Sequence, residues 1–221
     1  MLGIPHPDPT GPVCDDLWVV REGMVDFYVV RVETGLFVVD TGIHPEHTAS
    51  EMARLGLDPA SVSHVFFTHS DFDHTGGLAA FPDTASLFIG RGEIPLLEGR
   101  MARSLGIVKN KPLPRPPTWV DDGFTLEVGG RTVLALAMPG HTPGSTAYLV
   151  DNRWLFVGDA CTLNGGRASP VPWFLYMDRP RAWGSLRRVA TLKGVKRLCT
   201  AHSGVVSDFA AAMRKVKQAS A

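Results

Sequence analysis

The sequence predicts an α/β fold in which two β-sheets are covered by helices. Apolar, strand-like runs gather in two separate blocks, and segments with helical patterns follow each block. The composition supports a packed core, since 44% of the 221 residues are hydrophobic and only 20% are charged. This length suits one large domain, and we expect a single domain over residues 1–221.

The first block predicts an antiparallel meander followed by a helix and a buried strand. Gly23 and Gly35 separate its opening strands as turn residues. The next segment begins at Pro45 and stops at Gly56, as a helix does. The runs of this block are "LWVV" (17–20), "VDFYVVRV" (25–32), "LFVVD" (36–40), "PEHTASEMARLG" (45–56) and "HVFFT" (64–68).

The middle of the chain predicts shorter elements and one long loop. We expect a short helix in "GGLAAF", a strand at 86–90, a helical piece over 94–106, and an extended segment at 112–117 that contains four prolines.

The second block repeats the alternation of strands and helices. Its predicted elements are strands at 124–128, 132–138, 146–150, 154–159 and 197–202, a helix over 180–192, and a terminal helix that contains "DFAAAMRKVKQ".

The charge balance points to a small-molecule substrate. Lys and Arg together number 22, as do Asp and Glu, so no broad basic face is expected for nucleic acid or an anionic membrane. No run of about 18 apolar residues predicts a membrane span, and the first dozen residues do not resemble a secretory signal. Three cysteines, with no paired spacing, fit a reducing compartment. We therefore expect a cytoplasmic protein, and the oligomeric state stays open.

The stretch "THSDFDHTGG" (68–77) concentrates metal-ligand residue types at the end of a predicted strand. On an extended segment, alternate side chains share one side, so His69, Asp71 and Asp73 can converge. His74 precedes two glycines, where the chain can turn. Three further polar residues follow apolar runs in the same way: His141, Asp159 and His202. Taken singly, any of these residues could cap a helix or form a solvated turn.

Together, these pieces resemble the metallo-β-lactamase superfamily in order and context. The motifs that carry the resemblance are "FVVDTG" (37–42), "THSDFDHTGG", "PGHTPGS" (139–145), "FVGD" (156–159) and "TAHSG" (200–204). They extend over nearly the whole chain. The resemblance implies the metallo-β-lactamase fold, an αββα sandwich of two mixed sheets flanked by helices.

The resemblance also implies a centre of two divalent metal ions. One ion would be bound by His69, Asp71 and His141, and the other by Asp73, His74 and His202, with Asp159 between them. The usual motif is His-x-His-x-Asp-His, and this chain has Asp71 in place of the second histidine. Since carboxylate oxygens are harder ligands than imidazole, Asp71 favours iron or manganese more than an all-histidine zinc site does.

The activity implied by the resemblance is hydrolysis of a small carbonyl compound by metal-bound hydroxide, with a thioester, a lactone or a β-lactam as substrate. Asp73 is expected to orient the attacking group, and Tyr176 to donate a hydrogen bond to the developing oxyanion. The alternative is a mononuclear non-haem iron dioxygenase, similar to the persulfide dioxygenases, with His69, His141 and Asp159 as its ligands. The role of Cys161 and that of the aromatic loop at 171–178, either core or substrate wall, stay open.

Overall fold

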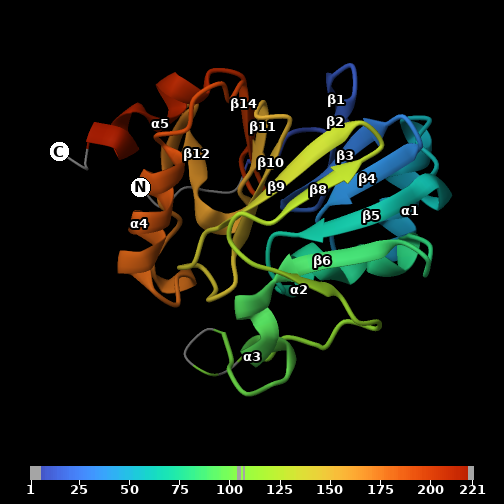
Figure 1. Cartoon of the computed structure of the whole chain (residues 1–221), viewed down its shortest axis with the longest axis horizontal. Coiled ribbons are helices and arrows are strands. Elements are labelled where there is room, and N and C mark those ends of the chain that lie inside the picture. The colour runs from blue at the N-terminus through green and yellow to red at the C-terminus, as the bar shows by residue number, and fades with distance from the viewer. Residues whose placement is uncertain (1–5, 104–105, 107, 219–221) are drawn as a thin grey trace.

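The structure is a computed structural model that describes residues 6–103, 106 and 108–218. Two β-sheets lie face to face, and helices cover the outer side of each (Figure 1). This arrangement confirms the predicted αββα sandwich. The helices are α1 (Pro45–Arg54), α2 (Phe72–Thr75), α3 (Ile94–Leu97), α4 (Arg179–Val189) and α5 (Phe209–Gln218).

The first sheet has the strand order β1-β2-β3-β4-β5-β6-β7. Strands β1 to β4 pair antiparallel, which confirms the predicted meander, and β4 to β7 pair parallel. The strands are β1 (Gly11–Cys14), β2 (Leu17–Glu22), β3 (Val25–Val32), β4 (Gly35–Val39), β5 (Val62–Phe67), β6 (Ser86–Gly90) and β7 (Thr118–Val120).

The second sheet has the order β15-β14-β11-β10-β9-β8, in which only the β11–β14 pair is parallel. A small hairpin of β12 and β13 stands apart from it. The strands are β8 (Thr125–Val128), β9 (Arg131–Ala137), β10 (Thr146–Val150), β11 (Trp154–Phe156), β12 (Thr162–Asn164), β13 (Arg167–Ser169), β14 (Arg197–Thr200) and β15 (Gly204–Val206).

Three apolar clusters hold the layers together. Tyr28 of β3 and Tyr148 of β10 lie in the cluster between the two sheets. Phe27, the neighbour of Tyr28, points to the other side and joins the cluster beneath α1. A third cluster packs the second sheet against α4 and α5. Because both faces of the sheets are buried in this way, strands such as β3 are apolar almost throughout.

Several short elements differ from the sequence prediction. The helix expected over 94–106 ends at Leu97, and Gly99, at φ 69°, turns the chain away from it. Strands β1, β7, β12, β13 and β15 were not predicted, since strands of three or four residues are too short to show a period.

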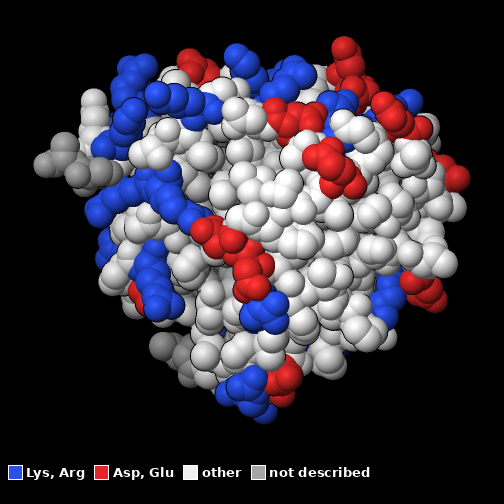
Figure 2. All heavy atoms as spheres, viewed as in Figure 1, with Lys and Arg blue, Asp and Glu red and all other residues white. Residues whose placement is uncertain are grey.

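Within the part of the chain that the structure describes, no helix combines the length and apolar character needed to cross a bilayer. On the face shown in Figure 2, Lys and Arg gather mainly on the left, over α4 and α5, while uncharged side chains cover most of the face.

Candidate metal centre

The seven predicted ligands come together at one end of the sandwich, on segments that follow strands. His69 and Asp71 lie just after β5, whereas Asp73 and His74 belong to α2. The other three are His141 in the β9–β10 loop, Asp159 in the turn after β11, and His202 between β14 and β15. Their donor atoms form three overlapping groups in which all distances are within 4.8 Å: His69, Asp71 and His141; His69, His74 and Asp159; and Asp73, His74 and His202.

Glycines let these segments approach one another. Gly158, directly before Asp159, has φ 52°, and a Cβ built on it would collide with the side chain of Thr68. Only glycine accommodates both the backbone conformation and the close approach. The turn after β11 thereby places Asp159 against the loop that follows β5.

Asp159 lies between two sets of histidines. Its Oδ2 is 3.4 Å from His141 Nε2, whereas its Oδ1 is 3.4 Å from His74 Nε2 and 3.2 Å from His202 Nε2. Each carboxylate oxygen thus faces a different side of the centre. This orientation is the one expected of a carboxylate shared by two cation positions.

The group formed by Asp73, His74, His202 and Asp159 has the spacing of metal ligands. His202 Nε2 lies 3.4 Å from Asp73 Oδ2, and His74 Nε2 lies 3.8 Å from the same oxygen. Ligands that surround a tetrahedral zinc ion at about 2.0–2.2 Å lie roughly 3.3–3.6 Å from one another. His69 Nε2, His74 Nε2 and Asp159 Oδ1 are buried without a hydrogen-bond partner, and a cation would satisfy such atoms. We call Asp73, His74, His202 and Asp159 the second group.

Asp40 orients two of the histidines from behind. Its Oδ2 accepts hydrogen bonds from His74 Nδ1 and Thr68 Oγ1, both at 2.8 Å, and its Oδ1 accepts from Thr68 N at 2.8 Å. Thr68 Oγ1 in turn accepts from His69 Nδ1 at 3.1 Å. Because each Nδ1 carries the proton, each Nε2 lone pair is directed into the centre. Asp40 therefore positions two of the candidate ligands and lies outside the ligand groups.

His202 is oriented by the main chain. Its Nδ1 donates to the carbonyl oxygen of Met24, in the turn between β2 and β3, at 2.5 Å. The backbone N–H of His6 binds the His202 carbonyl at 2.8 Å. His202 Nε2 is thereby directed toward Asp73 and Asp159.

The carboxylates of the second group favour positive charge. Burial lowers the pKa of His202, but Asp159 and Asp73 outweigh it and raise this pKa to about 11. Burial likewise lowers the pKa of His74, and Asp40, Asp73 and Asp159 together hold it well above its usual value. The second group therefore stabilises a cation, either a proton or a metal ion bound in its place.

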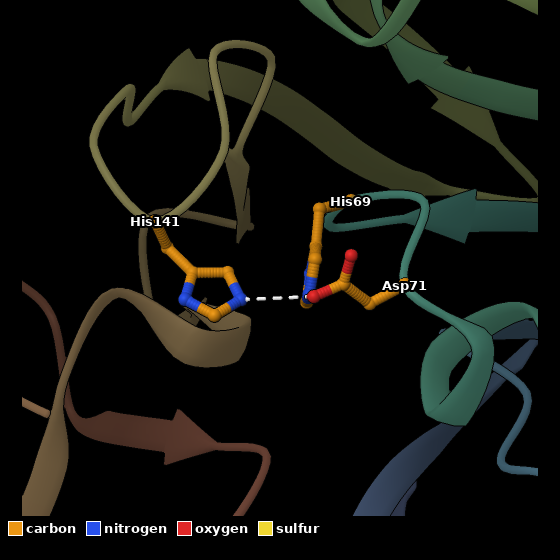
Figure 3. A group of neighbouring side chains, drawn as sticks. All are labelled: His69, Asp71 and His141. Atoms are coloured by element: carbon orange, nitrogen blue, oxygen red, sulfur yellow. Dashed lines mark hydrogen bonds and ion pairs between the residues drawn. The ribbon is translucent and has the colours of Figure 1, made fainter. Parts of the chain in front are cut away.

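We call His69, Asp71 and His141 the first group, shown in Figure 3. Asp71 Oδ2 lies 3.3 Å from His141 Nε2 and 3.4 Å from His69 Nε2. Burial raises the pKa of the Asp71 carboxyl, but His69 and His141 more than offset it, so this pKa lies well below its usual value. The pKa of His141, in contrast, is lowered, chiefly by burial.

Arg103 reaches into the first group, and no sequence pattern predicts this position. Its Nη2 lies 2.8 Å from Asp71 Oδ2 and 2.7 Å from His141 Nε2, and its Nε is 3.0 Å from both oxygens of Asp71. Asn110 Nδ2 also donates to Asp71 Oδ1, at 3.1 Å. No motif surrounds Arg103 or Asn110, so only the fold shows that they belong to the centre.

Glu93 was also missed, and it joins the two loops of the first group. Although fully buried, it accepts hydrogen bonds from Ser70 N and Gly144 N at 2.9 Å, and another from Ser70 Oγ. A buried carboxylate is tolerated when several donors satisfy it. Glu93 thus links the segment of His69 and Asp71 to that of His141.

A cavity of about 880 Å³ opens onto the centre. Asp71, Asp73, His141, Asp159 and His202 line its floor. Most of the wall is apolar, and Lys109 and Lys111 also line the cavity. The apolar lining residues are Met24, Phe72, Val108, Val171, Pro172, Phe174 and Leu175, so the 171–178 loop contributes to the wall.

Tyr176 and Cys161 lie behind this wall. The Tyr176 hydroxyl donates to Ala160 O at 3.2 Å and accepts from Val171 N at 3.0 Å. Its single proton is thus committed to the backbone in this arrangement, which braces the loop, while oxyanion stabilisation stays a prediction. Cys161 is buried, and burial raises the pKa of its thiol to about 12, which disfavours the nucleophilic thiolate.

The chain is similar to known proteins over most of its length. The family profile of the metallo-beta-lactamase superfamily matches residues 20–202. A hydroxyacylglutathione hydrolase of Shewanella sp. is 30% identical over 195 residues, which cover 87% of this chain and 63% of that protein. A probable metallo-hydrolase of Mycobacterium tuberculosis is 32% identical over 173 residues, covering 60% of this chain and 56% of the relative. The matches thus span less than two thirds of each relative.

Solved structures share the fold. The subclass B3 metallo-beta-lactamase BJP-1 of Bradyrhizobium japonicum superimposes with a TM-score of 0.71 at 24% identity, covering 89% of this chain and 78% of that one. At this identity, the similarity concerns the architecture alone.

Proposed function

Since the chain belongs to the metallo-beta-lactamase superfamily, we propose that it is a metal-dependent hydrolase of a small carbonyl compound. The observation that carries the proposal is the position of Asp159, whose two oxygens face histidines on opposite sides at the floor of an apolar cavity. Such a cavity with a few convergent polar groups is typical of a small-molecule site.

Asp73, His74, His202 and Asp159 would hold a divalent ion, either zinc or, given the carboxylates, iron or manganese. When bound, an ion of this kind polarises a carbonyl and makes water more acidic. A second ion among His69, Asp71 and His141 would complete the dinuclear centre that the resemblance implies. Arg103, however, contacts two of those three residues, Asp71 and His141.

The residues of this chain supply orientation and proton handling. Asp73 lines the cavity, and its carboxylate can accept a hydrogen bond from the attacking water and direct it at the carbonyl carbon. Asp40 and the Met24 carbonyl keep the His74 and His202 rings in one orientation, so the site is formed before substrate binds.

The cavity wall favours a substrate with an apolar portion. Phe72 and Phe174 line it, although their side chains are 58% and 54% exposed, and Lys109 and Lys111 stand nearby. This combination suits an acyl chain attached to a thioester or lactone carbonyl, with any negative charge near the lysines. The name of the Shewanella relative, an acylglutathione hydrolase, supports the thioester. A β-lactam is the third candidate carbonyl.

The oxygenase alternative has less support. The two relatives described above carry hydrolase names, and one is named for acylglutathione hydrolysis. No feature of the cavity favours oxygen chemistry over hydrolysis, so we do not propose a second function.

A hydrolysis screen tests the proposal. Purified protein, treated with chelator and then loaded with zinc, iron(II) or manganese(II), is assayed on acyl thioesters, N-acyl lactones and β-lactams of matched chain length. We expect metal-dependent cleavage that Asp73→Asn abolishes. Asp83→Asn is the matched control, because the fully exposed Asp83 side chain pairs only with Arg115 at the surface. Turnover without metal, or none with any of these substrates, would contradict the proposal.

A further inference from the structure

We propose that the guanidinium of Arg103 takes the place of a metal ion in the first group, so that the protein holds one divalent ion, in the second group. The inference rests on the proposed metal-dependent function and concerns which residues bind the ion. It starts from the contacts of Arg103, a side chain that is 92% buried and lies within hydrogen-bonding distance of Asp71 and His141.

The lone pair of His141 Nε2 is already used. Arg103 carries only N–H donors, so at 2.7 Å from Nη2 the Nε2 atom must act as the acceptor. A neutral imidazole nitrogen has one lone pair, which either accepts a hydrogen bond or binds a metal. His141 Nε2 therefore cannot accept the hydrogen bond from Arg103 and bind a metal ion at the same time.

Asp71 is also fully engaged. Arg103 Nε lies 3.0 Å from both of its oxygens, Nη2 lies 2.8 Å from Oδ2, and Asn110 adds a hydrogen bond to Oδ1. This forked pairing of guanidinium and carboxylate is the strong form of such contacts. Asp71 is thus paired with an arginine. A carboxylate at this position, where the usual motif has a histidine, suits a guanidinium.

The remaining donors of Arg103 are bound to the main chain. Nη1 donates to the His141 carbonyl at 2.5 Å, and both terminal nitrogens lie 3.4 Å from the Leu175 carbonyl. These contacts fix Arg103 to the loop of His141 and to the cavity wall. The guanidinium is therefore held as a part of the centre, and its donors face groups of this chain.

The charges agree with one ion. Asp71, Asp73 and Asp159 carry three negative charges, which one guanidinium and one divalent ion balance. A second divalent ion beside the guanidinium would add two positive charges to the same three carboxylates, and burying uncompensated charge is costly. Asp40 stands behind His74 in both states, so it does not change this difference.

The second group keeps donor atoms available for an ion. The Nε2 atom of His74 and the Oδ1 atom of Asp159 are buried without a hydrogen-bond partner among the described residues. The Nε2 atom of His69 is also unpartnered, and it lies within 4.8 Å of these two atoms, whereas Asp71 and His141 of the first group are paired with Arg103. Arg103 makes no hydrogen bond or ion pair to Asp73, His74 or His202 among its contacts in the described residues. The cation expected there must come from solution.

Metal counting tests this inference. The intact chain and its variants are saturated with zinc, freed of excess metal by gel filtration, and analysed for zinc per chain by mass spectrometry. We expect one zinc in the unchanged protein and two in Arg103→Met, which frees His141 and Asp71. Arg91→Met is the matched control, since Arg91 pairs with Asp121 at the surface, and it should keep one.

Two further variants decide the question if Arg103→Met does not fold, as circular dichroism would show. His141→Ala should retain one zinc, because His141 binds Arg103, whereas His202→Ala should lose it. Two zinc ions in the unchanged chain, one in a folded Arg103→Met, or loss of zinc from His141→Ala would overturn the role of Arg103. Absence of zinc from every one of these chains would instead contradict the metal-dependent function itself.

Discussion

The first and second groups lie on either side of Asp159, and each takes residues from the segment that follows β5, yet they face different cations. In the second group, burial is outweighed by Asp159 and Asp73, which raise the pKa of His202 to about 11, so the group attracts positive charge. In the first group, burial lowers the pKa of His141, and a guanidinium lies beside it. Similar ligand types at similar spacing can thus bind a metal ion from solution in the second group and the guanidinium of Arg103 in the first group.

The difference arises from what stands behind each histidine. His74 and His202 are held through Nδ1 by Asp40 and by the Met24 carbonyl, which directs Nε2 inward. For His141, Arg103 Nη2 lies 2.7 Å from Nε2 and 3.4 Å from Nδ1. Since Arg103 offers donors only, His141 is the one histidine of the centre whose partner competes for its lone pair.

The difference between the two groups is tested most directly by replacing one aspartate in each group with asparagine. Asp73→Asn removes a carboxylate of the second group and should abolish zinc binding, lowering kcat/KM by more than about 10³-fold, because a bound ion contributes several kcal/mol. Asp71→Asn should retain zinc, since its carboxylate faces Arg103. Zinc content and kcat/KM of the two variants decide the matter, and equal loss of zinc from both would show that the groups are alike.

A smaller effect is expected behind the second group. Asp40→Asn weakens the orientation of His74 and should reduce zinc affinity by about 10–100-fold, as replacement of such outer partners does. Asparagine suits the substitution because Asp40 has φ 62°, a conformation that asparagine tolerates. Competition with a chromophoric chelator measures the affinity, and an unchanged value would remove Asp40 from the account.

Glu93→Gln perturbs the first group and should spare the second. The substitution removes the charge that satisfies Ser70 and Gly144, and we expect metal-free protein to lose about 1–2 kcal/mol of its free energy of unfolding. Urea denaturation measures this loss. Zinc affinity should fall by less than in Asp40→Asn, and a larger fall would mean that the two groups are not independent.

The smallest effect lies far from both groups. Asp122 pairs with Arg188 of α4 at 2.8 Å, and this hydrogen bond lowers the pKa of the Asp122 carboxyl. A lowered pKa adds stability above the ordinary value, 3.8, which is lost as the pH falls through the folded-state pKa. Because the pair is exposed, Asp122→Asn should cost about 1 kcal/mol or less at pH 7 and nothing near pH 2.

Urea denaturation at the two pH values measures the Asp122→Asn difference, and zinc content should not change. A cost that persists at low pH would assign the effect to packing instead of charge.

The sequence predicted the two-sheet architecture and the seven residues that meet at the centre from two sources. Apolar runs mark strands, and the polar residues that follow them stand in motifs that resemble those of a known family. Arg103 could not be found in this way, since it follows no predicted strand and belongs to none of these motifs. The segment around it was expected to be helical to residue 106, whereas the helix ends at Leu97. Glu93, likewise, acts through backbone donors that no pattern displays.

The most direct test of the account is a crystal structure of the zinc-saturated protein, with anomalous diffraction recorded at the zinc edge. We expect one anomalous peak, within bonding distance of Asp73, His74, His202 and Asp159, and the Arg103 guanidinium between Asp71 and His141. A second peak bonded to His69, Asp71 and His141, with Arg103 displaced from them, would contradict the central claim.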